Sequence, residues 1–82
     1  MRIDKFLKIS RIIIRRTVAK KACDAGRVKI NDKVAKAGDE VNLGDLIEIS
    51  FGDDTRKYKV LEIKEQVGKK DAQDLYEIVD WI

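Results

Sequence analysis

The sequence predicts an α+β fold in which two N-terminal helices pack on a small, mostly antiparallel β-sheet. Apolar residues recur at helical spacing up to about residue 25, and an alternation of apolar and polar residues begins beyond Gly26. Turn residues then separate short apolar runs, and neither a repeat nor a proline indicates a linker. With 82 residues, of which 44% are hydrophobic and 40% charged, we expect residues 1–82 to form one small domain with an ionic surface.

The first helix is expected over about residues 5–11, directly after Asp4. An aspartate in this place can act as the N-cap, because its carboxylate accepts hydrogen bonds from the first backbone amides. The alternative role of Asp4 is to hold Arg2 or another nearby arginine in a fixed rotamer, and capping is the favoured role. The apolar face of this helix consists of Phe6, Leu7 and Ile9. The basic residues recur at a spacing of three on another side: Lys5, Lys8 and Arg11.

A second helix is expected over residues 18–25, with Thr17 as its N-cap. Gly26 would end it in the left-handed conformation, which glycine adopts at little cost. One stripe of this helix is predicted to face the core: Val18, Ala19, Ala22 and Cys23. We therefore interpret Cys23 as a small core residue and not as a reactive thiol.

The strands are expected in the remaining two thirds of the chain. Residues 27–35 predict a hairpin around Asn31-Asp32, and residues 46–51 predict a strand with Ile47 and Ile49 on one side. A further strand should follow the turn at residues 52–54, with alternation reaching to about residue 62. One helical turn capped by Asp71 and a closing strand over residues 76–79 complete the predicted fold.

Several classes of function are excluded or disfavoured by composition. Histidine is absent, which removes the most common general base and zinc ligand. No nucleophile elbow, Walker loop, dinucleotide-binding glycine pattern or CxxC pair occurs. We therefore expect no enzyme activity, no catalytic residue, no cofactor, no metal and no small-molecule substrate.

The lone cysteine cannot form an intramolecular disulfide, and no run approaches the roughly 18–20 apolar residues needed to span a bilayer. The N-terminus also lacks the apolar stretch of a secretion signal. We expect a cytoplasmic protein with no membrane partner.

The aromatic residues fall in apolar patterns, so core packing is favoured over base stacking for Phe6, Phe51, Tyr58 and Tyr76. Trp81 is interpreted either as a cap of the core or as part of a docking patch for a protein.

Charge is distributed unequally along the chain. Residues 1–36 carry twelve basic against three acidic residues, a net charge of +9, whereas residues 37–82 carry six against twelve, a net charge of −6. A molecule polarised in this way can bind a polyanion on one face while the other face repels it. RNA is the favoured polyanion, and the alternative is an ordinary solvated helix surface.

Four short motifs occur in an order that resembles the S4 RNA-binding domain. They are Asp4 with Phe6-Leu7, Arg16 with Ala19 and Lys20, the run Gly26-Arg27-Val28-Lys29-Ile30-Asn31, and Gly44-Asp45 before an apolar strand. The resemblance implies the S4 (alpha-L) fold, with a motif core over about residues 1–51 and a strand-rich extension over about residues 56–82. Members of the family often have Asn-Gly in the hairpin, and Asn31-Asp32 accepts positive φ less readily, so a different turn is expected here.

The N-terminal segment and the short extension resemble the RqcP (YabO) family of free-standing S4 proteins, which are relatives of the 15 kDa ribosome-associated heat-shock protein. The resemblance implies binding to the stalled large ribosomal subunit, through its rRNA and peptidyl-tRNA. It also implies a role in ribosome-associated quality control, in which an RqcH-type tailing factor adds C-terminal alanines to the nascent chain. We expect a monomer.

The resemblance implicates Arg2, Asp4 and Arg16 at matching motif positions. Arginine is ranked above lysine because its planar fork of donors suits phosphate and stacks on bases. The complete predicted RNA-binding set is Arg2, Asp4, Lys5, Lys8, Ser10, Arg11, Arg15, Arg16, Thr17, Lys20, Lys21 and Arg27.

Two other functions stay open. The chain could be a protein-interaction module whose acidic half and Trp81 end bind a partner, the basic helices being incidental. It could also be an accessory RNA-binding subunit that acts on another structured RNA.

Overall fold

The computed structural model describes residues 1–81, with side chains through residue 79. This part of the chain forms helices α1 (Ile3–Ile9) and α2 (Arg16–Asp24) and a short 3-10 helix, η1 (Ala72–Leu75). Five antiparallel strands form one sheet in the order β2-β1-β3-β4-β5. Their bounds are β1 Val28–Ile30, β2 Lys33–Val34, β3 Leu46–Phe51, β4 Asp54–Val60 and β5 Tyr76–Trp81.

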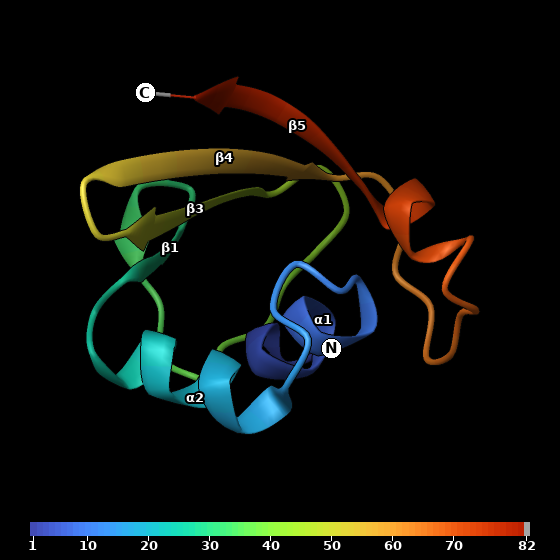
Figure 1. The fold of residues 1–82 in the computed structure, drawn as a ribbon, viewed down its shortest axis with the longest axis horizontal. Coiled ribbons are helices and arrows are strands. Elements are labelled where there is room, and N and C mark those ends of the chain that lie inside the picture. The colour runs from blue at the N-terminus through green and yellow to red at the C-terminus, as the bar shows by residue number, and fades with distance from the viewer. Residues whose placement is uncertain (82) are drawn as a thin grey trace.

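Both α-helices lie on one face of the sheet (Figure 1), which confirms the α+β class. Neither α1 nor α2, nor any other helix in the described part, has the length and apolar composition that crossing a membrane requires. The side chain of Trp81 lies outside the described residues, so its two predicted roles stay predictions.

Helix α1 begins at Ile3, two residues earlier than the sequence predicted. The backbone before it is tied to the segment that precedes β3, because the Ile3 amide donates to the Asp39 carbonyl over 2.8 Å and the Val41 amide donates to the Met1 carbonyl over 2.9 Å. Asp4 therefore lies in the first turn of the helix, and Arg2 occupies the N-cap position without a side-chain capping bond. The expected N-cap role of Asp4 is wrong.

Helix α2 begins at Arg16, so Thr17 lies inside the first turn and the N-cap position belongs to Arg15. No side-chain capping bond forms there, and the predicted cap by Thr17 is also wrong. The predicted end is confirmed, since Gly26 follows the helix with φ of +73°. The predicted core stripe is confirmed for Ala19 and Cys23, which are buried, whereas Val18 is 49% exposed.

The β1–β2 hairpin turns through Asn31 and Asp32, whose φ angles of +50° and +70° match a type I′ turn. The expectation of a different turn is therefore wrong. Asn31 is fixed from outside the hairpin, because its side chain donates to Asp45 and accepts from the Leu46 amide, each over 3.0 Å. These bonds hold the first turn residue in place and connect the hairpin to the start of β3.

The core lies between the helices and the sheet. Phe6 and Leu7 of α1 and Ile47 and Ile49 of β3 are essentially inaccessible to solvent, and Tyr58 of β4 is buried. The core prediction is thus confirmed for Phe6 and Tyr58 and is wrong for Phe51, which is 38% exposed at the end of β3. The Tyr58 and Tyr76 rings meet edge to face at 5.3 Å between centroids.

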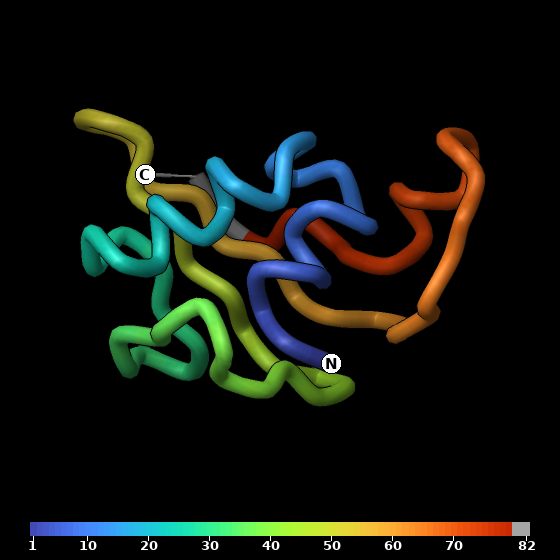
Figure 2. Tube along the Cα trace, turned by 90° about the horizontal axis from the view of Figure 1, so that it is seen from below, coloured from blue at the N-terminus to red at the C-terminus, as the bar shows by residue number. Residues whose placement is uncertain are grey.

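Strand β4 ends at Val60 instead of continuing to residue 62, because the chain leaves the sheet there. The Leu61 amide donates to the Leu75 carbonyl over 2.9 Å, and the intervening segment forms a loop that swings outward (Figure 2). The helical turn at η1 is confirmed, although Asp71 makes no side-chain capping bond. Strand β5 confirms the predicted closing strand and extends it to residue 81.

The hairpin geometry predicts the effect of Asp32→Gly. Glycine adopts a φ near +70° without the steric strain of an L side chain, so this change should stabilise the fold by about 0.5–1 kcal/mol. Urea unfolding followed by circular dichroism measures the difference. The matched control is Asn31→Gly, which should lower stability because it removes two side-chain hydrogen bonds. Equal destabilisation by both changes would contradict this account of the turn.

Candidate RNA-binding surface

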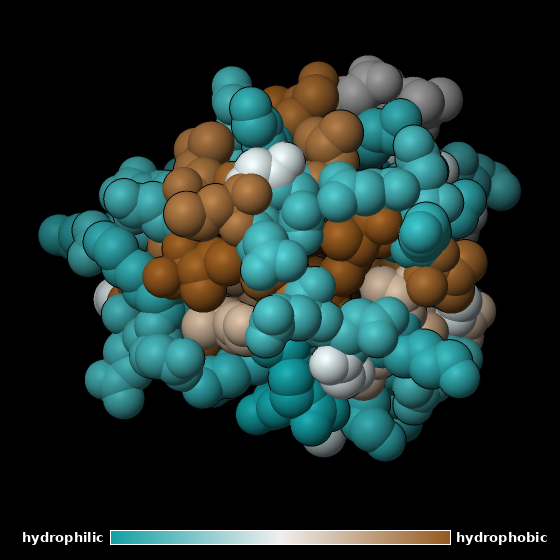
Figure 3. Space-filling view, turned by 180° about the vertical axis from the view of Figure 1, so that it is seen from behind, coloured by the Kyte–Doolittle hydropathy of each residue, from teal (hydrophilic) through white to brown (hydrophobic). Residues whose placement is uncertain are grey.

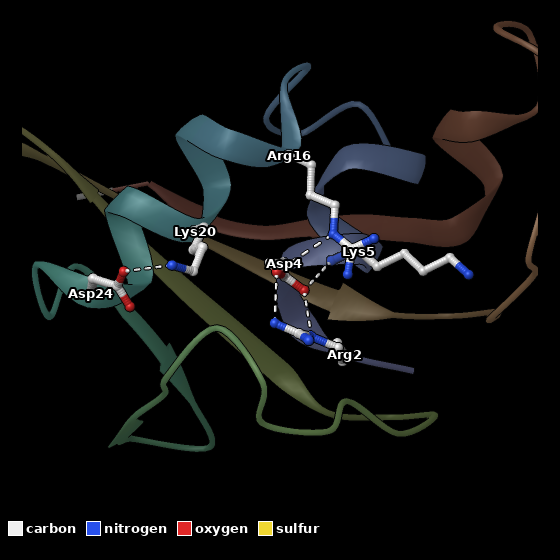
Figure 4. A network of polar contacts seen from close by, with 6 residues as sticks. All are labelled: Arg2, Asp4, Lys5, Arg16, Lys20 and Asp24. Carbon is white, nitrogen blue, oxygen red and sulfur yellow. Dashed lines mark hydrogen bonds and ion pairs between the residues drawn. The ribbon is translucent and has the colours of Figure 1, made fainter.

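Asp4 is a buried carboxylate, 2% exposed, that joins two segments of the chain. Its Oδ1 accepts from the Lys5 amide over 2.8 Å and from Arg2 Nε over 3.2 Å, and its Oδ2 accepts from Arg2 Nη2 over 3.2 Å. Arg16 Nε, at the start of α2, lies 3.5 Å from the same Oδ2 (Figure 4). We name Arg2, Asp4 and Arg16 the Asp4 cluster. It shows that the alternative role of Asp4, as a positioner of arginines, is the one that the structure adopts.

In each arginine of the Asp4 cluster, one edge of the guanidinium contacts Asp4 and the rest of the side chain reaches the surface. Their side chains are 52% exposed for Arg2 and 45% exposed for Arg16. The contact of Arg16 with Asp4 uses Nε, so it does not consume the terminal amino groups of the guanidinium. A partly anchored guanidinium loses less rotamer freedom when it binds an anion, which favours binding to a phosphate.

Lys5, Lys8 and Arg16 together line a hollow of about 330 Å³ beside the Asp4 cluster. Glu65 and Gln66 form its other wall, and Glu65 pairs with the Lys5 ammonium. The hydrogen bond and charge of Lys5 lower the pKa of Glu65, so Glu65 is an anion at neutral pH. A carboxylate from the acidic half of the chain therefore occupies part of the basic surface, instead of lying on a separate face.

Along helix α2, residues four apart lie on the same side. Arg16 and Lys20 lie on the side of the Asp4 cluster, and Lys20 pairs with Asp24 over 3.7 Å (Figure 4). The exposed residues Thr17 and Lys21 lie on the outward side. Lys20, Thr17 and Lys21 are thus accessible, but only Lys20 is on the side of the Asp4 cluster.

Arg11 follows the end of α1 with φ of +62°, a conformation that glycine adopts more cheaply. With Lys8 it lines a second hollow, of about 320 Å³, against the same loop residues, Glu65 and Gln66. A non-glycine residue in a strained conformation at a candidate site is an argument for a role of its side chain. Arg11 therefore extends the basic surface beyond the Asp4 cluster.

Besides Thr17 and Lys21, three residues of the predicted set do not join this surface. Ser10 is buried, and its hydroxyl donates to the Leu7 carbonyl over 3.2 Å, so its side chain serves the end of α1. Arg15 and Arg27 line an apolar groove together with Val18, which lies on the opposite flank of α2 from Arg16. The continuous basic face inferred from the sequence is therefore two separate regions.

The Cys23 thiol and the carboxylates are the remaining groups that could react or bind a metal ion. Burial raises the pKa of the Cys23 thiol to about 11, and the carboxylates of Asp4, Asp24 and Asp39 contribute to the shift. A thiol with this pKa forms almost no thiolate at neutral pH, which confirms Cys23 as a core residue. Among the side chains that the structure describes, no three His, Cys, Asp or Glu residues are grouped so that they could hold a metal ion.

Glu65 and Gln66 are the site residues that the sequence did not indicate. They stand sixty residues from Lys5 in the chain, and the loop that carries them shows no apolar periodicity that would place it against α1. No local signal could have predicted the contact, because it depends on how η1 and β5 return the chain to the sheet.

The position of Asp4 predicts a difference between two aspartates of similar chemistry. Asp4→Asn keeps the size of the side chain but removes the charge that both arginines share, so it should lower the free energy of unfolding by about 1–2 kcal/mol. Asp24→Asn is the control, because it breaks an exposed pair on α2 that is worth only about 0.3–0.5 kcal/mol. Urea titrations of both variants provide the measurement, and equal losses would show that Asp4 is an ordinary surface ion pair.

The sequence is similar to a known domain family and to named proteins. The model of the S4 domain family matches residues 1–47. The RQC P-site tRNA stabilizing factor of Streptococcus pneumoniae is 49% identical over 79 residues, covering 96% of this chain and 90% of that protein. The protein of the same name from Bacillus subtilis is 44% identical over 79 residues, covering 96% of this chain and 92% of that protein.

Two solved structures share the fold. The heat shock protein 15 of Vibrio cholerae, described as trimeric, superposes with a TM-score of 0.88 and 30% identity over 96% of this chain and 81% of that one. The solution structure of the hypothetical protein HP1423 has a TM-score of 0.83 and 34% identity, and covers 98% of both chains. These similarities and the extent of the matched sequence lead to one conclusion: the chain belongs to the S4 domain family and, within it, to the RqcP family of RQC P-site tRNA stabilizing factors.

Proposed function

We propose that this protein is a non-catalytic RNA-binding factor of ribosome-associated quality control, which holds structured RNA through the Asp4 cluster and the basic side chains beside it. The observation that carries the proposal is the buried Asp4 carboxylate, which presents Arg2 and Arg16 from two different segments on one surface. The names of the relatives support RNA as the ligand, since those proteins are called RQC P-site tRNA stabilizing factors.

The chemistry of the surface suits the shape of folded RNA. A-form helices expose phosphates and 2′-hydroxyls, whereas their major groove is too narrow and deep for side chains to read bases. Two anchored guanidinium groups flanked by Lys5 and Lys8 match a row of phosphates more closely than a specific base edge. Binding should therefore depend on RNA shape and strongly on salt.

The finer part of the proposal concerns the ribosome. On the stalled large subunit, the protein would contact rRNA and peptidyl-tRNA at the same time and hold the tRNA while an RqcH-type factor adds alanines. The two basic hollows share Lys8 and form one continuous surface, with Arg16 at one end and Arg11 at the other, along which an RNA backbone could lie. We propose that the chain acts there as a monomer in the cytoplasm.

Arg16→Ala tests the proposed surface. The variant should bind large ribosomal subunits about tenfold or more weakly and should show a smaller salt dependence, because one anchored phosphate contact is lost. Co-sedimentation with purified subunits over a range of KCl concentrations measures both quantities. Lys59→Ala is the control, because Lys59 is exposed and lies far from the proposed surface in the fold. Its neighbours in β4, Tyr58 and Val60, are buried under the helices, so the alternation of side chains along a strand places Lys59 on the opposite face of the sheet. Wild-type binding by Arg16→Ala, or an equal loss in the control, would exclude this surface.

Glu65→Gln tests whether the loop carboxylate competes with RNA. Removing the anion that pairs with Lys5 should raise RNA affinity about two- to fivefold at low salt, the range expected when an exposed ion pair no longer has to be broken. Fluorescence anisotropy with a labelled rRNA hairpin or tRNA gives the affinity. Glu62→Gln removes a carboxylate that pairs with Lys64 on the same loop and should leave the affinity unchanged. A gain of the same size in both variants would indicate a general effect of net charge.

A further inference from the structure

Apolar side chains reach the surface in several places between hydrophilic ones, as the face seen in Figure 3 illustrates. The proposed RNA surface does not use them. One group forms an open groove of about 590 Å³ between the segment after α1, helix α2 and strand β3. Its wall includes Ile14, Val18 and Phe51, which are 69%, 49% and 38% exposed. Large apolar side chains exposed together mark a binding surface more often than isolated ones do.

The charged residues among the described lining of this groove are both basic. Arg15 and Arg27 belong to its wall, and no acidic residue is found among the described residues that line it. The guanidinium of Arg56 also stacks on the Phe51 ring at 5.3 Å from its centroid. A ligand that complements this groove therefore needs apolar side chains to contact its aliphatic residues and carboxylates to pair with Arg15 and Arg27.

The composition of the groove favours a protein occupant over RNA. Bases in single-stranded RNA are held by stacking on aromatic rings or guanidinium planes and by hydrogen bonds to their edges. Here Phe51 is the one aromatic residue among the described lining residues, and the Arg56 guanidinium already stacks on its ring. Arg15 and Arg27 could contact RNA, but the aliphatic chains of Ile12, Ile14 and Val18 between them offer no hydrogen-bonding group. Aliphatic side chains of a protein match such a floor better than bases do.

A second copy of the chain fits less well than a different protein. One exposed apolar site, around Val34, includes Asp39 and Glu40, whose carboxylates already contact the Lys36 amide and the N-terminal ammonium. Another surrounds Leu43 and Leu61. Its charged residues, Glu62 and Lys64, pair with each other over 3.3 Å, so this site has no excess negative charge to offer the two arginines. The carboxylates of these two sites already have partners, so charge complementarity favours a partner with its own acidic segment.

We propose that the groove lined by Ile14, Val18 and Phe51 docks an acidic protein segment that carries two or more large apolar side chains. The apolar side chains would enter the groove, and Asp or Glu residues beside them would pair with Arg15 and Arg27. This site lies on the flank of α2 opposite Arg16, so one molecule could hold RNA and the acidic segment at the same time.

Site-specific crosslinking in cells tests the proposal on the full-length chain. The photoreactive residue p-benzoylphenylalanine replaces Val18, and mass spectrometry identifies the crosslinked partner peptide; the same residue at Leu43 is the control. The expected result is one protein segment rich in Asp or Glu that crosslinks from position 18 and not from position 43. Crosslinks to RNA only, to a second copy of the chain, to neutral or basic segments, or none at all would each overturn the proposal.

The identified segment is then synthesised as a fluorescent peptide and titrated with purified protein. Ile14→Ser together with Val18→Ser should weaken binding about tenfold or more, because both side chains supply apolar contact area. Leu43→Ser should leave it unchanged, and large-subunit binding should stay within about twofold in both variants. Should the double variant fail to fold, Ile14→Ser alone serves the same comparison, since this side chain is the most exposed of the three. Unchanged peptide binding in a folded variant contradicts the proposal.

Discussion

The buried carboxylate of Asp4 is the constraint on which the rest of the proposed RNA-binding surface depends. A charge that is 2% exposed is stable only when it is paired and hydrogen-bonded, and here a backbone amide and two arginines supply those contacts. Since Arg2 precedes α1 and Arg16 begins α2, satisfying one carboxylate also brings the starts of both helices together. The contacts of Asp4 with Arg2 and Arg16 thus join the two helices and also orient the two arginines of the proposed surface.

This arrangement explains why the surface combines two kinds of cation. Arg2 and Arg16 are anchored on their inner side and offer donors in fixed directions, whereas Lys5 and Lys8 are mobile charges beside them. In the proposed function, the anchored groups define where a phosphate sits and the mobile groups adapt to its neighbours. A folded RNA, whose phosphates keep a regular spacing, suits such a mixed surface.

The basic N-terminal part and the acidic C-terminal part of the chain do not form two opposite faces of the molecule. Glu65, from the acidic half, lies against Lys5, and Arg15 and Arg27, from the basic half, border an apolar groove on the other flank of α2. The sheet makes this possible, because η1 and β5 bring the chain back beside β4 and leave the loop between β4 and η1 beside α1. Position in the fold, and not position in the chain, decides what each charge does.

The sequence by itself determined the order of helices and strands, the core roles of Phe6 and Cys23, and the left-handed turn at Gly26, because periodicity and glycine geometry act over a few residues. Motif order also indicated the family. Only the tertiary structure decided that Asp4 positions arginines instead of capping, that Asn31-Asp32 adopts a type I′ turn, and that Glu65 reaches Lys5. These outcomes depend on contacts between distant segments: the pairing of residues 1–3 with 39–41, the bonds from Asn31 to the start of β3, and the path of the loop before η1. Local pattern carries no information about such contacts.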